Sequence, residues 1–251
     1  MLGEYLLKYN YRQGISRNRM THNISSSEIE KFNDFATDWW DENGRMKSLH
    51  DINPLRLEYI MRQTDLKGKR VLDVGCGGGI LTERIARQAA ATIGIDASSE
   101  MTAIARTHAK QSNLDIHYID TDIEHITRFT ETGFDVILCM ELLEHVPSYE
   151  SVITACKNAL NPGGILIFAT INRNLMSFLL AVVAAEYVLG LLPKGTHDWA
   201  SLIKPSELAR ACSDAGLKQV DITGFSYNPI TRNYYLCKNS MVNYLASFTA
   251  V

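Results

Sequence analysis

The sequence has few of the features that mark secreted, disulfide-rich or nucleic-acid-binding proteins. Its five cysteines are odd in number, scattered and mostly within apolar runs, which argues against a disulfide framework or a zinc site and indicates a reducing compartment. The net charge is −3, which gives no electrostatic reason to expect a nucleic-acid partner. No internal repeat, low-complexity segment or compositional linker divides the 251 residues. One substantial core is therefore expected.

The first twenty residues carry four basic side chains against one acid, and they lack the apolar stretch of a secretory signal. An organelle-targeting segment is one interpretation. We favour an ordinary basic, frayed N-terminus, so residues 1–22 are predicted to be a poorly ordered extension. A single domain over residues 23–251 follows it.

The most informative stretch is an apolar run that ends abruptly in glycines. Val71–Val74 has the composition of a buried parallel strand, and Gly75, Gly77 and Gly79 follow at alternate positions. This pattern predicts a strand that turns into a helix N-terminus, which is a common ligand site. A dinucleotide fingerprint would need a third glycine at position 80, but that residue is Ile80.

Strand and helix patterns then alternate, which predicts βαβ units and a parallel sheet covered on both faces. The expected strands span residues 92–96, 116–119, 134–140 and 165–171, and the expected helices 81–91, 98–112 and 149–160. In such sheets, ligands bind beyond the carboxyl ends of the strands.

Before the glycines, a serine-capped helix is expected from Ser25 through Trp40, because apolar residues including Phe32 and Trp39 follow at helical spacing, and another helix is expected from Pro54. Near the end of the chain, strands are expected over 217–223 and 234–237, with a turn at Tyr227 that contributes to a ring pocket.

The second expected strand ends in an acid, 21 positions after Gly75. The carboxylate of this residue, Asp96, can accept hydrogen bonds from both hydroxyls of a ribose, and glycine backbone allows a nucleoside to lie close over the turn. The alternatives are a plain helix cap at Asp96 and a ligand-free tight turn at the glycines. Turn, acid and strand order together favour a nucleoside ligand.

This constellation resembles the class I S-adenosylmethionine-dependent methyltransferases. Residues 23–245 resemble, more specifically, the ubiquinone-biosynthesis O-methyltransferases, which methylate hydroxyls on a polyprenylated phenol ring. The segments that carry the resemblance are Trp39-Trp40-Asp41, Leu49 to Arg56, Val71 to Gly79, Cys139 to Val146, Asn172-Arg173-Asn174, Pro193 to Asp198 and Tyr227 to Thr231.

The resemblance implies a Rossmann-like α/β fold with a mostly parallel seven-stranded sheet and helices on both faces. It also implies an N-terminal helical cap over residues 23–66 and an apolar insertion over residues 172–200, after the fifth strand. The implied reaction is O-methylation of 3-demethylubiquinol and 2-polyprenyl-6-hydroxyphenol types of acceptor, with S-adenosylmethionine as the methyl donor.

The family's cofactor contacts fall on Arg56, Gly75, Asp96 and Met140, and Gly77 lies in the same turn. The resemblance assigns the methionyl carboxylate to Arg56 and the ribose to Asp96, while Met140 can pack against the adenine. A solvated helix charge at Arg56 and a plain core residue at Met140 are the alternatives. Asp122 is a further candidate, as an acceptor for the adenine amino group.

Two carboxylates and an imidazole follow the fourth strand, at Glu141, Glu144 and His145. They offer the ligands that a divalent cation such as Mg²⁺ prefers, and related proteins are thought to use these positions for a metal. Glu144 and His145 are also the predicted catalytic residues, because a phenolic acceptor must lose its proton. The alternatives are that His145 is a general base without a metal, or that both residues only begin a helix.

Residues 175–192 form an apolar stretch with basic residues at both ends. We favour an interfacial helix or lid that meets the membrane surface and admits the lipid-like substrate. A transmembrane helix and a buried core helix are the alternatives. The expected location is the cytoplasm, peripherally at the inner membrane, or the mitochondrial matrix face in a eukaryote.

Two other functions remain open at this stage. The chain could methylate another small apolar acceptor, or it could be a non-catalytic cofactor-binding subunit of a membrane-associated assembly. Other proteins of ubiquinone biosynthesis are candidate partners.

Overall fold

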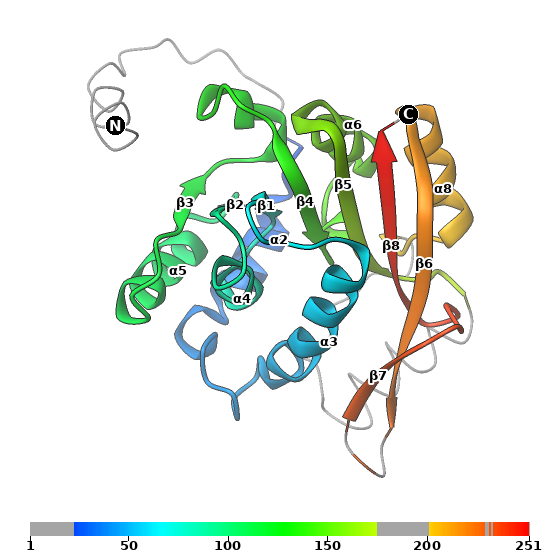
Figure 1. The fold of residues 1–251 in the computed structure, drawn as a ribbon. Coiled ribbons are helices and arrows are strands. Elements are labelled where there is room, and N and C mark those ends of the chain that lie inside the picture. Colours follow the sequence, from blue (N-terminus) through cyan, green and yellow to red (C-terminus); the bar gives the residue numbers. More distant parts are fainter. Residues whose placement is uncertain (1–22, 175–200, 229–230, 232, 251) are drawn as a thin grey trace.

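The computed structural model of the chain describes residues 23–174, 201–228, 231 and 233–250. One sheet runs through this part of the chain, with helices on both of its faces (Figure 1). The predicted N-terminal extension, residues 1–22, and the predicted membrane segment, residues 175–192, lie outside the described residues.

Eight strands form the sheet in the described part of the chain. They are β1 (Arg70–Val74), β2 (Ala91–Asp96), β3 (His117–Asp120), β4 (Phe134–Met140), β5 (Leu160–Ile171), β6 (Leu217–Asn228), β7 (Asn233–Cys237) and β8 (Asn243–Ala250). Their order is β3-β2-β1-β4-β5-β8-β6-β7. The pairs among β1 to β5 are parallel, whereas β8 is antiparallel to both β5 and β6.

The helices connect and cover these strands. The α-helices are α2 (Ser26–Asn33), α3 (Lys47–Gln63), α4 (Ile80–Ala86), α5 (Ser99–Gln111), α6 (Tyr149–Ala159) and α8 (Pro205–Asp214). Short 3₁₀ helices are η2 (Ala36–Asp38), η3 (Ile123–Arg128) and η4 (Leu143–His145). Serine side chains cap α2, α5 and α6 by accepting a backbone N–H of the first turn, as expected for residues that satisfy the unpaired donors there.

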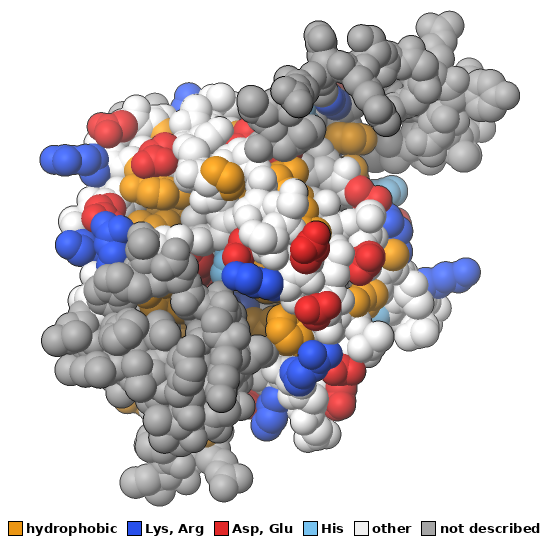
Figure 2. All heavy atoms as spheres, turned by 180° about the vertical axis from the view of Figure 1, so that it is seen from behind, with side chains coloured by type: hydrophobic (Ala, Val, Ile, Leu, Met, Phe, Trp, Pro, Cys, Tyr) orange, Lys and Arg blue, Asp and Glu red, His pale blue; other side chains and the backbone are white. Residues whose placement is uncertain are grey.

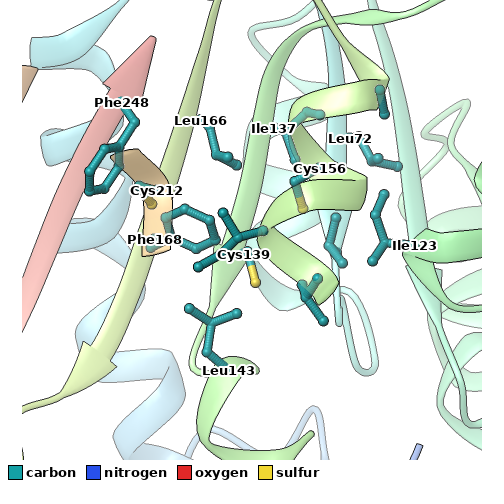
Figure 3. Close-up of a cluster of buried hydrophobic side chains, with 14 of the residues drawn as sticks. Leu72, Ile123, Ile137, Cys139, Leu143, Cys156, Leu166, Phe168, Cys212 and Phe248 are labelled. Atoms are coloured by element: carbon teal, nitrogen blue, oxygen red, sulfur yellow. The ribbon is translucent and has the colours of Figure 1, made fainter. Parts of the chain in front are cut away.

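The central strands are apolar on both faces because each face packs against helices. Leu72, Cys139 and Phe168 point into a cluster with residues of α6 and α8 (Figure 3). Their neighbours, such as Val71 and Leu138, point into a second cluster with α3 and α4. A strand that is buried on both faces reads as a continuous apolar run, which is the pattern that the sequence shows at residues 134–140.

The α/β fold with helices on both faces is confirmed, but the predicted strand count of seven is wrong. The additional strand is β8, which lies between β5 and β6 and which the sequence pattern did not indicate. The strand expected over residues 234–237 is present as β7, at the edge of the sheet. Tyr227, predicted in a turn, continues β6 and pairs with Tyr234.

Two predicted helix boundaries are also wrong. The helix from Ser25 ends at Asn33, before Trp39 and Trp40, so these tryptophans lie in a separate short segment after η2. Pro54 is inside α3 and does not begin it. The helix begins seven residues earlier, at Lys47, and tolerates a proline that lacks one backbone donor.

Acidic and basic side chains are interspersed over the described part of the face in Figure 2. Within the described ranges, no helix is both long and apolar enough to cross a membrane.

Replacing Phe168 with Ala should lower the free energy of unfolding by about 3–5 kcal/mol, because the ring is fully buried and contacts Phe248 edge-on. Phe129→Ala is the matched control, since that ring is 43% exposed and its loss should change stability by about 0.5 kcal/mol. Urea denaturation measures both. Similar losses for the two variants would contradict the assignment of the core.

Candidate active site

The glycine turn joins β1 to α4 over the carboxyl edge of the sheet. The backbone N–H groups of Gly75 and Cys76 both donate to the carbonyl oxygen of Ile95 in β2, at 2.9 and 3.0 Å. Gly75, Gly77 and Gly79 have φ values of 71°, 53° and 89°, a region that glycine adopts without the steric cost that other residues meet. The turn therefore requires these glycines for its backbone shape.

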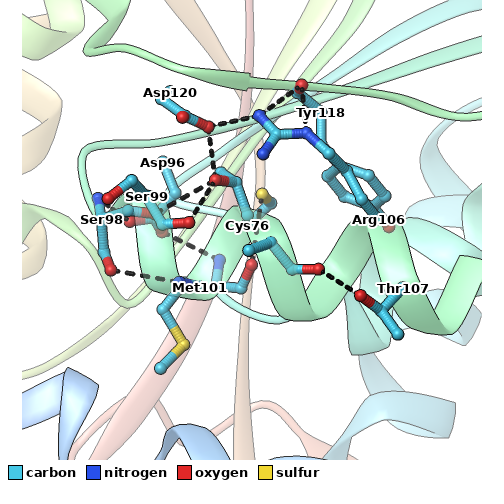
Figure 4. Close-up of polar contacts among 12 residues, drawn as sticks. Cys76, Asp96, Ser98, Ser99, Met101, Arg106, Thr107, Tyr118 and Asp120 are labelled. Atoms are coloured by element: carbon cyan, nitrogen blue, oxygen red, sulfur yellow. Dashed lines mark hydrogen bonds and ion pairs between the residues drawn. The ribbon is translucent and has the colours of Figure 1, made fainter.

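Asp96 fastens this turn to the end of β2. One of its carboxylate oxygens accepts from the N–H of Gly77 at 2.9 Å, and the other accepts from the N–H of Ser98 at 2.8 Å. The side chain that caps α5 is that of Ser98, which accepts from Met101 (Figure 4). Asp96 is thus not a plain helix cap, and burial raises its pKa despite these bonds.

The two acids at the end of β3 and just beyond it have different surroundings. Asp120 accepts hydrogen bonds from Thr102 and Arg106 of α5 and does not line the cavity described below (Figure 4). Asp122 lines that cavity, caps η3 and bonds to His125. Of these two acids, only Asp122 is placed to contact a ligand over the turn.

The N-terminal segment covers the turn from above. Trp39 packs directly on the backbone of Gly77 and Gly78, and the Trp40 indole N–H donates to the carbonyl of Gly78 at 2.9 Å. A Cβ at position 78 would lie 2.2 Å from Trp39, so only glycine permits this contact. The two adjacent tryptophans therefore hold the cap onto the turn.

A cavity of about 520 Å³ lies between the cap and the carboxyl ends of the strands. All six predicted cofactor-binding residues line it together: Arg56, Gly75, Gly77, Asp96, Asp122 and Met140. Glu141 and His145 line it as well, whereas Glu144 does not. Met140 contacts both the cavity and the core, so the two interpretations of this residue are compatible.

Arg56 is buried, which makes the alternative of a solvated helix charge wrong. Its guanidinium forms an ion pair with Glu141, and its Nε has no hydrogen-bond partner. A buried guanidinium with an unsatisfied donor is suited to an anionic group of a ligand.

The residues after β4 are held in separate environments. Glu141 has a φ of 54°, an uncommon conformation for a residue with a side chain and one often found at functional sites. Glu144 is buried and accepts from Thr170 at 3.0 Å, while burial first and Glu141 second raise its pKa to about 8. The predicted catalytic role of Glu144 has no support in this arrangement. His145 lines the cavity, and its Nδ1 lies 2.8 Å from a carboxylate oxygen of Glu28.

These three side chains do not fit a divalent cation as they are arranged. Glu141 is paired with Arg56, Glu144 favours the neutral form, and His145 is paired with Glu28. The described residues contain no group of three His, Cys, Asp or Glu side chains that could hold a metal ion. The Mg²⁺ site stays a prediction without structural support, and we assign no catalytic step to a metal.

Sequence reasoning missed several residues of the cavity wall. Asn53 is buried with an unpartnered side-chain oxygen. Tyr234 lines the cavity with its ring centroid 5.0 Å from that of Tyr227, the residue that the sequence did place near a ring pocket. Glu28 lies in the first turn of α2, where the sequence alone indicates only an acid that stabilises the start of a helix. No local pattern identifies these residues, because their partners are distant in the sequence.

A family model for a methyltransferase domain matches residues 49–222. A ubiquinone biosynthesis O-methyltransferase of Coxiella burnetii is 50% identical over 227 residues, which cover 90% of this chain and 97% of that protein. A protein of the same name from Pasteurella multocida is 49% identical over 236 residues, covering 90% of this chain and 98% of that protein.

The chain belongs to the ubiquinone biosynthesis O-methyltransferase family. Solved structures of methyltransferases share its fold. Magnesium protoporphyrin IX methyltransferase from Synechocystis, solved with bound SAH, has a TM-score of 0.65 at 17% identity and covers 89% of this chain and 98% of its own. An N-methyltransferase from Bradyrhizobium japonicum in complex with S-adenosyl-L-homocysteine has a TM-score of 0.59 at 19% identity, covering 88% and 97%. The family and fold predicted from the sequence are confirmed.

Asp73, near the carboxyl end of β1, makes the free energy of unfolding depend on pH. The residue is buried and accepts from Thr82 at 2.6 Å, and burial raises its pKa to about 6 from an ordinary value of 3.8. The native state therefore holds this proton more tightly than the unfolded chain, and the wild type loses stability as the pH rises through this interval. Between about pH 5 and about pH 7, Asp73→Asn should gain about 1 kcal/mol relative to the wild type in urea unfolding.

Asp135→Asn is the matched control with the opposite sign. Hydrogen bonds from the backbone N–H of Arg70 and from Asn161 lower the pKa of Asp135, so its contribution to stability is present at neutral pH and is lost as the pH falls. The Asp135→Asn variant should thus lose stability relative to the wild type as the pH rises toward about 4, and the difference should stay constant between about pH 5 and about pH 7, where Asp73→Asn gains. The same slope for both variants would contradict these assignments.

Proposed function

We propose that this chain transfers a methyl group from S-adenosylmethionine to a phenolic hydroxyl of polyprenylated ubiquinone precursors, of the 3-demethylubiquinol and 2-polyprenyl-6-hydroxyphenol types. The observation that carries the proposal is the 50% identity over 90% of the chain to a ubiquinone biosynthesis O-methyltransferase. The cavity supports it, because it combines nucleoside-binding groups at the glycine turn with an imidazole beside them.

The cofactor fits the donors and acceptors of the cavity. S-adenosylmethionine, when bound, supplies an electrophilic methyl group on a sulfonium. Arg56 would bind the methionyl carboxylate with its unsatisfied buried donor. Asp96 would accept from the ribose hydroxyls, since a carboxylate has about four acceptor sites and two are used by backbone N–H groups. Met140 and Asp122 would contact the adenine, and Gly75 and Gly77 give it close access to the backbone.

His145 acts on the acceptor in this proposal. A phenolate attacks the methyl group far better than a phenol, so the hydroxyl must lose its proton as the new bond forms. The imidazole lies on the cavity wall, and a histidine side chain is the usual protein group for accepting a proton at neutral pH, which suits a general base. The O–H bond of the acceptor breaks, and the proton passes to the imidazole and then to solvent.

We further propose that residues 175–192 meet the membrane surface and admit the polyprenyl substrate, which places the protein peripherally at the inner membrane. The support is chemical: the stretch is apolar with basic residues at both ends, and a polyprenyl phenol is dissolved in lipid.

In vitro methyl transfer to a short-chain catechol analogue tests the reaction, with the methylated product detected by mass spectrometry. The wild type should form product, and Asp96→Ala should raise the Kd for S-adenosylhomocysteine at least about 10-fold by removing a carboxylate acceptor. Asp120→Asn is the matched control, because Asp120 also ends a strand but lies off the cavity, and its Kd should match the wild type. Binding of the cofactor analogue without any methylation of the catechol would favour the non-catalytic subunit.

Flotation with liposomes tests the membrane proposal. The wild type should float with vesicles that contain anionic lipid, and a variant without residues 176–191 should not. The deletion variant must still bind S-adenosylhomocysteine, which shows that it is folded. Equal flotation of both proteins would refute a role for this segment at the membrane.

A further inference from the structure

Helix α2 holds the imidazole of His145 on two sides. The Nδ1 atom lies 2.8 Å from an oxygen of Glu28, and the ring of Phe32 meets the imidazole edge-on at a centroid distance of 5.2 Å and an angle of 89°. Glu28 and His145 are 117 positions apart in the sequence. The orientation of the imidazole thus depends on the cap as well as on the segment that carries it.

The carboxylate of Glu28 is itself held in place. One oxygen accepts from Lys31 at 2.6 Å, and the other faces His145. Burial acts to raise the pKa of Glu28, but the bonds from Lys31 and His145 outweigh it and lower this pKa. Glu28 is therefore ionised at neutral pH and can only accept hydrogen bonds.

Helix α2 is fastened to the rest of the molecule at both ends. Just before it, Asn23 exchanges hydrogen bonds with the backbone of Ser148, at 2.7 and 2.8 Å. At its last residue, Asn33 accepts from the Ser98 hydroxyl at 2.6 Å, two positions after Asp96. The helix also lines the cavity through Glu28 and Phe32.

We infer that Glu28 is a positioning residue that acts through His145: its carboxylate accepts the Nδ1–H and fixes the tautomer whose basic lone pair lies on Nε2. This inference rests on the proposed function, in which His145 takes the proton of the acceptor hydroxyl. The O–H bond of the acceptor breaks, an Nε2–H bond forms, and the carboxylate stabilises the resulting imidazolium. Helix α2 also lines the cavity. One placement of this helix would therefore both cover a bound cofactor and align the base.

Glu28→Gln is the sharpest variant because of Lys31. The ammonium of Lys31 only donates, so it should bind the amide oxygen and turn the amide NH₂ toward His145 Nδ1. The imidazole would then carry its proton on Nε2 and lose its basic lone pair there. We expect kcat to fall at least about 10-fold, with the KM for both substrates within about twofold of the wild type.

A double-mutant cycle with His145→Ala separates positioning from packing. If Glu28 acts through His145, Glu28→Gln should cause no further loss of kcat when His145 is already absent. Glu30→Gln is the matched control, since Glu30 is exposed on the same helix and carries the same charge, and its kcat should equal that of the wild type. Losses that multiply in the double variant would overturn the inference.

Nitrogen-15 NMR of the His145 imidazole shows which ring nitrogen carries the proton, and the measurement does not depend on methyl transfer. The wild type should show the proton on Nδ1, and Glu28→Gln should move it to Nε2. An unchanged tautomer would overturn the inference even if kcat fell. Absence of methylated catechol with the wild type would count against the proposed function alone, because the NMR result would still decide the role of Glu28.

Discussion

The carbonyl oxygen of Ile95 is the point on which the site depends. It accepts two consecutive backbone donors, from Gly75 and Cys76, so the chain must leave the sheet immediately after β1. The carboxylate of Asp96, the next residue, then accepts from Gly77 and sets the far side of the turn. The shape of the turn is thus fixed by a neighbouring strand before any ligand arrives, and the ligand meets a backbone that is already organised.

The sequence alone was sufficient for the central sheet and for the cofactor side of the cavity. Strands β1, β2 and β4 are short apolar runs that end in glycine or acid, and the ends of parallel strands meet at one edge, so Gly75, Asp96 and Met140 had to lie close together. The C-terminal part was less accessible. The stretch 243–250 mixes small, polar and aromatic residues, and only its place between β5 and β6 makes it a buried strand.

The acceptor side of the cavity could not be derived in the same way. Adjacency in the sequence suggested that Glu141, Glu144 and His145 act together, but the segment turns sharply after β4 and sends each side chain to a different partner. Those partners, Arg56, Thr170 and Glu28, come from three other elements. A motif reports which residues are near one another along the chain, whereas tertiary packing decides which way each one points.

The position of β8 has a consequence for how the molecule is made. This strand, residues 243–250, lies between β5 and β6, so the two halves of the sheet are joined only through it. During synthesis, β5 and β6 both keep an exposed edge until residues 243–250 have left the ribosome, and exposed edges pair readily with other chains. The incomplete sheet must therefore be kept from aggregating from the synthesis of β5 until β8 joins the two halves.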